Sequence, residues 1–290
     1  MAARTVRPTG FATGEEAVPR STWPAPDGTP LLVRHWPAAG DPWATVLMVH
    51  GIGEHSGRYE RTGRLMAGAG LDVYAFDLRG HGLSGGRRVY AHRWDDFLDD
   101  LAVGLARVRR EGRPLALLGH SMGALIALTY VCSDRPAPDL LVLSALPLGA
   151  RTPAWQRILA PVMSRVAPSL LVANPITGDQ LSRDPEVGIA YFADPLVQPR
   201  STARLGAELL RAMKRARSQI GRLHIPTLVI HGGADTLVPT AVSEPLTGVA
   251  GVERRVLPDL RHEVLNEPEG PEVVAMVVEW LRSHLPAASG

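Results

Sequence analysis

The chain has 290 residues, of which 45% are hydrophobic and 21% charged, and its formal net charge is +2. This composition is typical of a soluble globular protein, and so small a net charge argues against a nucleic-acid partner. Cys132 is the only cysteine, which excludes an internal disulfide framework and a thiolate metal cluster; we expect it to be a buried apolar residue.

The first 20 residues combine small, polar and basic types without an apolar run. We therefore expect a disordered tail over residues 1–20 and no secretory signal peptide. The sequence predicts a cytoplasmic protein without a transmembrane segment.

From residue 21 onward, apolar strand patterns alternate with helical ones. Asp27-Gly28 is a hairpin signal within the segment 22–36. The predicted strands cover residues 43–50, 71–76, 115–118, 140–143, 227–230 and 254–257, and the predicted helices cover 59–69, 94–108, the segment from 124 onward, and 272–281. Repeated strand–helix units predict an α/β fold with a mostly parallel central sheet and helices on both faces.

A gap of about 75 residues between the strands at 140–143 and 227–230 interrupts this alternation, and it is too long for a simple connection. Apolar residues recur in it at helical spacing, and Pro161 is expected to kink or split the helix there. We predict a helical cap, or lid, over residues 147–222, inserted between core segments 21–146 and 223–285. An enlarged structural insertion is the alternative.

The segment from Gly119 to Gly123 reads Gly-His-Ser-Met-Gly, between a predicted strand and a predicted helix. This pattern in this context is typical of a nucleophile elbow, in which a tight turn needs glycine on both sides of the serine. We predict that Ser121 is a catalytic nucleophile.

A serine nucleophile needs a base and an acid that orients the base, and in this architecture they follow the serine in the order acid, then His. Asp235 lies just past the predicted strand 227–230, and His262 lies between the last strand and the last helix. We predict Asp235 as the acid, with Asp259 as a rival, and His262 as the general base.

Backbone N–H groups are expected to form the oxyanion hole. The predicted donors are Met122, directly after the nucleophile, and Ile52 in the Gly-rich loop after the first core strand. The remaining histidines of the Gly-rich turns are predicted to shape these loops, at His50, His55, His81 and His120. None has metal-ligand spacing, and the segment 77–82 lacks a nucleotide-binding fingerprint, so we expect no metal and no cofactor.

Several motifs together resemble the monoacylglycerol lipase branch of the α/β-hydrolases, over roughly residues 30–282. They are the stretches His50–Tyr59, Phe76-Asp77 with Gly80–Gly82, Gly119–Gly123, Leu181–Pro185, Tyr191 with Asp194–Leu196, His231-Gly232 with Asp235, and His262 with Asn266–Pro268. One departure is Ala124, where this family usually has a second glycine after the elbow. The resemblance implies the α/β-hydrolase fold, serine esterase activity and a lid that contacts membranes peripherally.

The resemblance also implies that Glu54, Arg58 and Tyr191 hold the glycerol head group of the substrate. For Glu54 and Arg58 the alternative is a local salt bridge that shapes the loop. Along a predicted helix, Arg204, Glu208, Arg211 and Arg215 share one face; this face is expected either to rest on anionic lipid or to be solvated.

The expected function is hydrolysis of carboxylic esters, monoacylglycerols first, through an acyl-enzyme on Ser121. A lysophospholipase or a broad carboxylesterase would share every residue named above. A hydrolase-fold binding protein without turnover is the alternative from another class, although all three triad positions are filled. The sequence identifies a small lipid ester as the partner and no protein partner.

Overall fold

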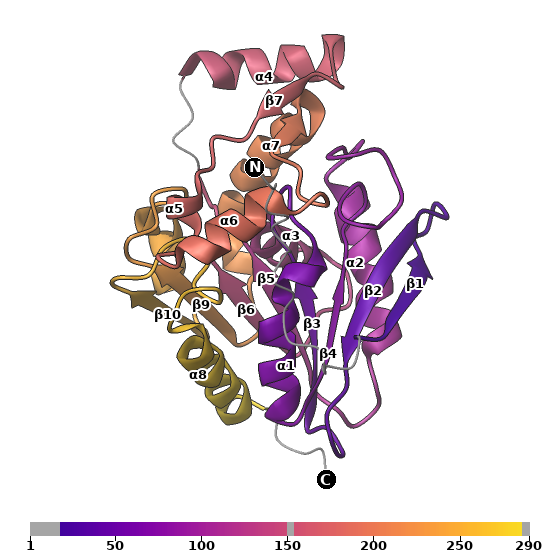
Figure 1. The fold of residues 1–290 in the computed structure, drawn as a ribbon, viewed down its shortest axis with the longest axis vertical. Coiled ribbons are helices and arrows are strands. Elements are labelled where there is room, and N and C mark those ends of the chain that lie inside the picture. Colours follow the sequence, from indigo (N-terminus) through magenta and orange to yellow (C-terminus); the bar gives the residue numbers. More distant parts are fainter. Residues whose placement is uncertain (1–17, 150–153, 286–290) are drawn as a thin grey trace, which may run out of the picture.

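The computed structural model of the chain describes residues 18–149 and 154–285, and its centre is one eight-stranded sheet (Figure 1). The strand order is β1-β2-β4-β3-β5-β6-β9-β10. The strands are β1 (Arg20–Pro24), β2 (Pro30–Trp36), β3 (Ala44–Val49), β4 (Leu71–Phe76), β5 (Leu115–His120), β6 (Leu140–Ser144), β9 (Thr227–Gly232) and β10 (Val252–Leu257). β1 and β2 form the predicted hairpin, β2 runs antiparallel to β4, and the other neighbours are parallel.

The predicted fold class is therefore confirmed. Of the predicted tail, residues 1–17 lie outside the described residues, and the prediction is wrong at Arg20, which pairs with Arg34 in the hairpin.

Helices cover both faces of the sheet and bury its apolar side chains. α1 (Glu60–Gly68) and α8 (Gly270–Ser283) pack on one face, and α2 (Asp95–Val108), α3 (Met122–Val131) and α7 (Ala203–Gln219) pack on the other. Every residue of β3, β5, β6 and β9 is buried, as expected of parallel strands covered on both sides. This burial is the main source of the stability of the fold. Polar side chains are therefore expected in the loops at the carboxyl ends of the strands.

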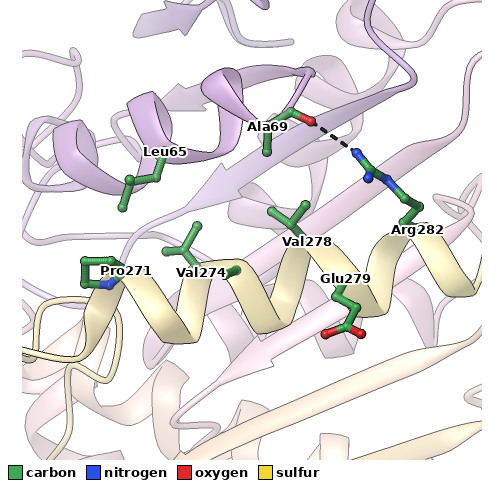
Figure 2. A pocket seen from close by; sticks show the side chains of 8 residues that line it. Leu65, Ala69, Pro271, Val274, Val278, Glu279 and Arg282 are labelled. Carbon is green, nitrogen blue, oxygen red and sulfur yellow. Dashed lines mark hydrogen bonds between the residues drawn. The ribbon is translucent and has the colours of Figure 1, made fainter.

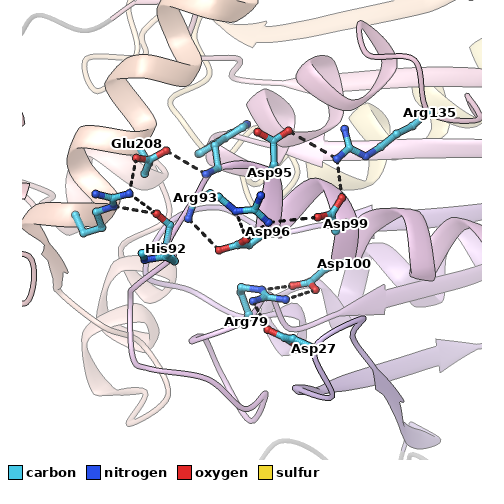
Figure 3. A network of polar contacts seen from close by, with 12 residues as sticks. Asp27, Arg79, His92, Arg93, Asp95, Asp96, Asp99, Asp100, Arg135 and Glu208 are labelled. Atoms are coloured by element: carbon cyan, nitrogen blue, oxygen red, sulfur yellow. Dashed lines mark hydrogen bonds and ion pairs between the residues drawn. The ribbon is translucent and has the colours of Figure 1, made fainter.

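One acid of α2 is buried together with the apolar side chains of the helix. Asp100 is fully buried and accepts two hydrogen bonds of 2.6 Å from Arg79. Arg79 also binds Asp27 at 2.9 Å (Figure 3). Burial raises the pKa of the Asp100 carboxyl, and the bidentate contact with Arg79 offsets part of this desolvation while it ties the β4–α2 connection to the helix.

A cap of helices and one small ribbon lies between β6 and β9 in sequence, beyond the carboxyl ends of the strands (Figure 1). It contains α4 (Ala154–Val166), β7 (Leu171–Ala173), α5 (Gly178–Leu181), α6 (Pro185–Ala193) and β8 (Arg200–Thr202), and α7 and the short helix η2 (Ile220–Arg222) lead back to the sheet. The antiparallel β7–β8 ribbon was not predicted, because three-residue strands are too short to show a periodic pattern.

Pro161 does not split α4, contrary to one form of the prediction: the helix continues from Ala154 to Val166. A proline removes only its own N–H, and a helix can keep its hydrogen bonds on both sides of it. The structure describes the backbone but not the side chains at positions 154–158, whereas Leu159, Val162 and Val166 are exposed.

The charged face of α7 makes contacts within the protein. Glu208 is buried and accepts a hydrogen bond from the backbone N–H of Trp94 at 3.1 Å. Arg204 donates to the carbonyl oxygen of His92, and Arg215 pairs with Asp95 at 3.4 Å. This face therefore packs against the segment that enters α2, and contact of its exposed part with lipid stays a prediction. Its other side joins the core beside α3.

A shallow groove of about 330 Å³ lies between α1 and α8 (Figure 2). Leu65, Val274 and Val278 line it, and Arg282 donates to the carbonyl oxygen of Ala69 at its end. None of the predicted catalytic residues is among its lining residues. In the described part of the chain no helix is both long and apolar enough to span a bilayer.

Candidate active site

Ser121 occupies a strained turn between β5 and α3. Its backbone has φ +52° and ψ −118°, a conformation that side-chain-bearing residues rarely adopt. A Cβ atom on Gly119 would lie 2.4 Å from the carbonyl oxygen of Gly123, and one on Gly123 would lie 2.2 Å from that of Val49. Both neighbours must therefore be glycine for the turn to close, as the sequence pattern predicted.

The structure brings the predicted acid and base together. Asp235 follows β9 and His262 follows β10, and the two strands are parallel neighbours whose carboxyl ends share one edge. Asp235 Oδ2 lies 2.7 Å from His262 Nδ1, while Oδ1 accepts the backbone N–H groups of Leu237 and Val238. The rival Asp259 is exposed.

Hydrogen bonding keeps Asp235 ionised. Burial by itself would raise the pKa of this carboxyl, but hydrogen bonds from His231 and His262 outweigh burial and hold the pKa well below its usual range. An ionised Asp235 accepts the proton on His262 Nδ1. With the proton on Nδ1, the lone pair of the His262 ring is on Nε2. Nε2 is then the atom that can accept a proton as a general base.

The imidazole of His262 lies beside the elbow. Its ring centre is 4.9 Å from that of His120, the residue before Ser121. His120 Nδ1 lies 3.1 Å from Ser144 Oγ, and burial, assisted by the nearby His262, lowers the pKa of His120 to about 4. His120 is therefore neutral near pH 7 and orients the turn, as predicted.

The loop after β3 lies against the nucleophile. A Cβ on Gly51 would lie 3.3 Å from the Cβ of Ser121, so the loop that carries Ile52 reaches the elbow closely. Met122 is the first residue of α3, where backbone N–H groups have no partner inside the helix. Both predicted oxyanion donors are thus on segments adjoining Ser121, and one such donor contributes about 3 kcal/mol in acyl transfer.

Two of the other predicted loop-shaping histidines make defined contacts. His50 accepts the backbone N–H of Leu78 at Nε2 and contacts the carbonyl oxygen of Gly51 at Nδ1. His55 Nε2 lies 2.8 Å from Asp194 at the end of α6, which joins the loop to the cap. No group of three metal-ligating side chains occurs among residues 18–149 and 154–285.

Glu54 and Arg58 form a buried ion pair at 2.7 Å, which is the local salt bridge considered as the alternative. The guanidinium group of Arg58 also binds Glu263 through two hydrogen bonds of 2.6 and 2.8 Å. The ring of Tyr191, from α6 of the cap, stacks over the same guanidinium at 4.7 Å. The structure thus brings the three predicted head-group residues together.

Sequence reasoning missed Glu263, because a single Glu in a loop has no pattern of its own. Its position directly after the predicted base is the signal that could have indicated it.

Comparisons with known proteins show the family to which the chain belongs. The family described as serine aminopeptidase S33 matches residues 40–269. The chain is 38% identical over 269 residues to a monoacylglycerol lipase of Mycolicibacterium smegmatis, covering 89% of this chain and 95% of that protein. The chain belongs to the monoacylglycerol lipase branch of the α/β-hydrolase family. The resemblance predicted from the sequence motifs is therefore confirmed.

Two further relatives outline the range of this family. The crystal structure of Paleococcus ferrophilus monoacylglycerol lipase matches with a TM-score of 0.80 and 32% identity, over 88% of this chain and 99% of that one. Phospholipase YtpA of Bacillus subtilis is 30% identical over 242 residues, which are 81% of this chain and 93% of that protein. Members of the family thus differ in the substrate named for them.

A pH–rate profile tests the assignment of a histidine base. A protonated imidazole cannot accept the serine proton, so we expect kcat/KM to fall as the pH is lowered below neutrality. Burial lowers the pKa of His81 to about 3, and that of His120 is also low, so neither should contribute to this limb. A profile that stays flat down to about pH 4 would contradict a histidine base.

Proposed function

We propose that this protein is a serine esterase that hydrolyses monoacylglycerols to glycerol and a fatty acid. The observation that carries the proposal is the Asp235–His262 pair beside Ser121 on its strained turn, in a chain that belongs to the monoacylglycerol lipase branch. A binding protein without turnover would have no use for a strained serine beside an oriented imidazole.

The reaction follows from the roles of these three residues. His262 Nε2 takes the proton of Ser121 as the hydroxyl oxygen attacks the ester carbonyl, and Asp235 stabilises the imidazolium that forms. The N–H groups of Ile52 and Met122 bind the oxyanion of the tetrahedral intermediate. Collapse expels glycerol, which takes the proton from His262. Water then attacks the acyl-enzyme while His262 takes a proton from it, and the fatty acid leaves as Ser121 Oγ takes that proton back from His262.

The head group is proposed to bind beside Arg58 and Tyr191. The hydroxyl of Tyr191 is buried and has no hydrogen-bond partner among the described residues, so a substrate hydroxyl could satisfy it. The carboxylate of Glu54 can accept fewer further hydrogen bonds. Its Oε1 already accepts the backbone N–H of Gly51 and the hydroxyl of Tyr59, and its Oε2 accepts an N–H of Arg58. A glycerol hydroxyl could reach only the remaining lone pair of Oε2.

A lysophospholipase is the second candidate, and the similarity to a Bacillus phospholipase supports it. Both reactions use the same triad and differ only in the head group that leaves. A broad carboxylesterase is the third reading and would need no head-group contact at all.

A substrate series separates these candidates. The value of kcat/KM is measured for monoacylglycerols of several chain lengths, for a lysophospholipid and for p-nitrophenyl esters. We expect the monoacylglycerols to be preferred. A preference for the lysophospholipid would move the assignment to the second candidate, and turnover of short aryl esters alone would remove the glycerol head group from the proposal.

We also propose peripheral membrane contact through the cap. Its outer surface exposes Leu170, Leu171 and Val172 beside α4, and Ile189 and Phe192 on α6, and exposed apolar groups of this kind favour an interface with lipid. Flotation with phosphatidylcholine vesicles should carry the protein upward, and Val172→Asp should weaken that flotation. If the wild type and the Val172→Asp variant both stay at the bottom of the gradient, the proposed membrane contact is contradicted.

A further inference from the structure

Glu263 links parts of the site that come from distant strands. It directly follows His262, on the loop after β10, while Arg58 belongs to the segment after β3. Three strands, β5, β6 and β9, lie between β3 and β10 in the sheet. The two hydrogen bonds of 2.6 and 2.8 Å between Glu263 and Arg58 therefore cross the top of the sheet and join its two halves.

The contact continues from Arg58 to the loop that carries the predicted oxyanion donor. Arg58 binds Glu54 Oε2 at 2.7 Å, and Glu54 Oε1 accepts the backbone N–H of Gly51 at 2.6 Å. Gly51 directly precedes Ile52. An unbroken chain of charge-assisted hydrogen bonds thus runs from the neighbour of the base to the neighbour of the oxyanion donor.

The same cluster touches the elbow. Tyr59 donates its hydroxyl to Glu54 at 2.9 Å, and its ring centre lies 6.5 Å from that of His120, the residue before the nucleophile. The side chains of Glu54, Arg58 and Glu263 are 4%, 10% and 5% exposed, so solvent screens these contacts little. A buried bidentate arginine–carboxylate pair fixes direction as well as distance.

We propose that Glu263 is a positioning residue for the esterase reaction. Its ion pair with Arg58 holds the loop of His262 at a fixed place relative to the loop of Ile52. The base and the oxyanion donor must act on the same ester carbonyl, and small displacements between such groups reduce the rate of reaction strongly. This inference rests on the proposed esterase function.

The charges in the cluster suggest a variant that should still fold. Glu54 and Glu263 share one guanidinium, and although burial opposes ionisation, Arg58 lowers the pKa of both carboxyls, so the cluster carries one surplus negative charge. Glu263→Gln leaves a balanced Glu54–Arg58 pair. The amide oxygen of Gln accepts one N–H of Arg58 where the carboxylate accepted two, so the variant loosens the link without exposing an unpaired charge.

The chain offers a matched control in Asp100. It is a buried carboxylate that binds Arg79 through two hydrogen bonds, and Asp27 pairs with the same guanidinium, so Asp100→Asn also leaves a balanced pair (Figure 3). Arg79 and Asp100 join the β4–α2 connection to α2 and contact none of the predicted catalytic residues. The two variants therefore make the same chemical change inside and outside the site.

The experiment measures kcat and KM with p-nitrophenyl butyrate, and thermal unfolding, for the wild type, Ser121→Ala, Glu263→Gln and Asp100→Asn. The expected result for Glu263→Gln is a kcat about 10- to 100-fold lower with a nearly unchanged KM. Asp100→Asn should lower the unfolding temperature but keep the wild-type kcat. If Glu263→Gln does not fold, Glu263→Asp, which retains the charge but shortens the reach, should show the same loss in kcat.

Two outcomes would overturn the positioning role: a folded Glu263 variant with wild-type kcat, or equal losses of kcat in the Glu263 and Asp100 variants. Ester hydrolysis by the wild type that disappears in Ser121→Ala establishes the esterase function in the same assay. Failure of the function is thereby distinguished from failure of the positioning role.

Discussion

Replacing Ser121 by Ala is expected to lower kcat for every ester substrate by about 10⁶-fold, because the acyl-enzyme can no longer form. The residual rate should come from the oxyanion donors and from substrate binding, which do not need the hydroxyl. The measurement is the steady-state rate with a monoacylglycerol and with an aryl ester, at enzyme concentrations high enough to detect the residual rate.

The control for this prediction is Ser218→Ala. Ser218 is an exposed serine on α7 whose hydroxyl donates to the carbonyl oxygen of Arg215, remote from the elbow. It should retain wild-type activity. Full activity in a folded Ser121→Ala protein would show that the nucleophile lies elsewhere in the chain.

Replacing Asp235 by Asn is expected to lower kcat by about 10⁴-fold. The carboxylate accepts the Nδ1 proton of His262 at 2.7 Å, whereas an amide that turns its NH₂ group toward the ring favours the other tautomer. The lone pair would then be on Nδ1, facing away from Ser121. Because Asn has nearly the same shape, the backbone N–H groups of Leu237 and Val238 keep an acceptor, and the fold should survive.

Asp259→Asn is the matched control for this loss, since Asp259 is an exposed acid on the loop that leads to His262. It should leave kcat/KM unchanged at every pH between about 5 and 8, the range in which histidine titrates. A loss in Asp259→Asn equal to that in Asp235→Asn would favour the rival acid that the sequence left open.

The sequence predicted the sheet well because its signals are local. The apolar run at 71–76 coincides with β4, and the glycines around Ser121 are required by contacts of 2.4 and 2.2 Å that no other residue could accommodate. The order of the carboxyl-terminal loops then placed Asp235 and His262 on one edge. Each of these inferences needs only neighbours in sequence and the rule that parallel strands end together.

Other features depend on contacts between distant segments, which spacing does not record. Asp100 and Glu208 look like solvated acids on their helices, and only the folded chain gives them Arg79 and the N–H of Trp94 as partners. Glu263 meets Arg58 across 205 positions of sequence. Polar residues at such sites are buried because a partner compensates the cost of desolvation, and the partner is unknown until the topology is known.

The position of α7 has a consequence for how such chains diversify. β6 and β9 are parallel neighbours, so the chain needs a crossover helix between them, and α7 packs beside α3 in the main core as that helix. The segment from α4 to β8 is then an addition to a complete crossover unit. Grafting that segment from a relative with another ester preference should exchange chain-length selectivity while the sheet, the elbow and the hydrolytic chemistry are inherited unchanged.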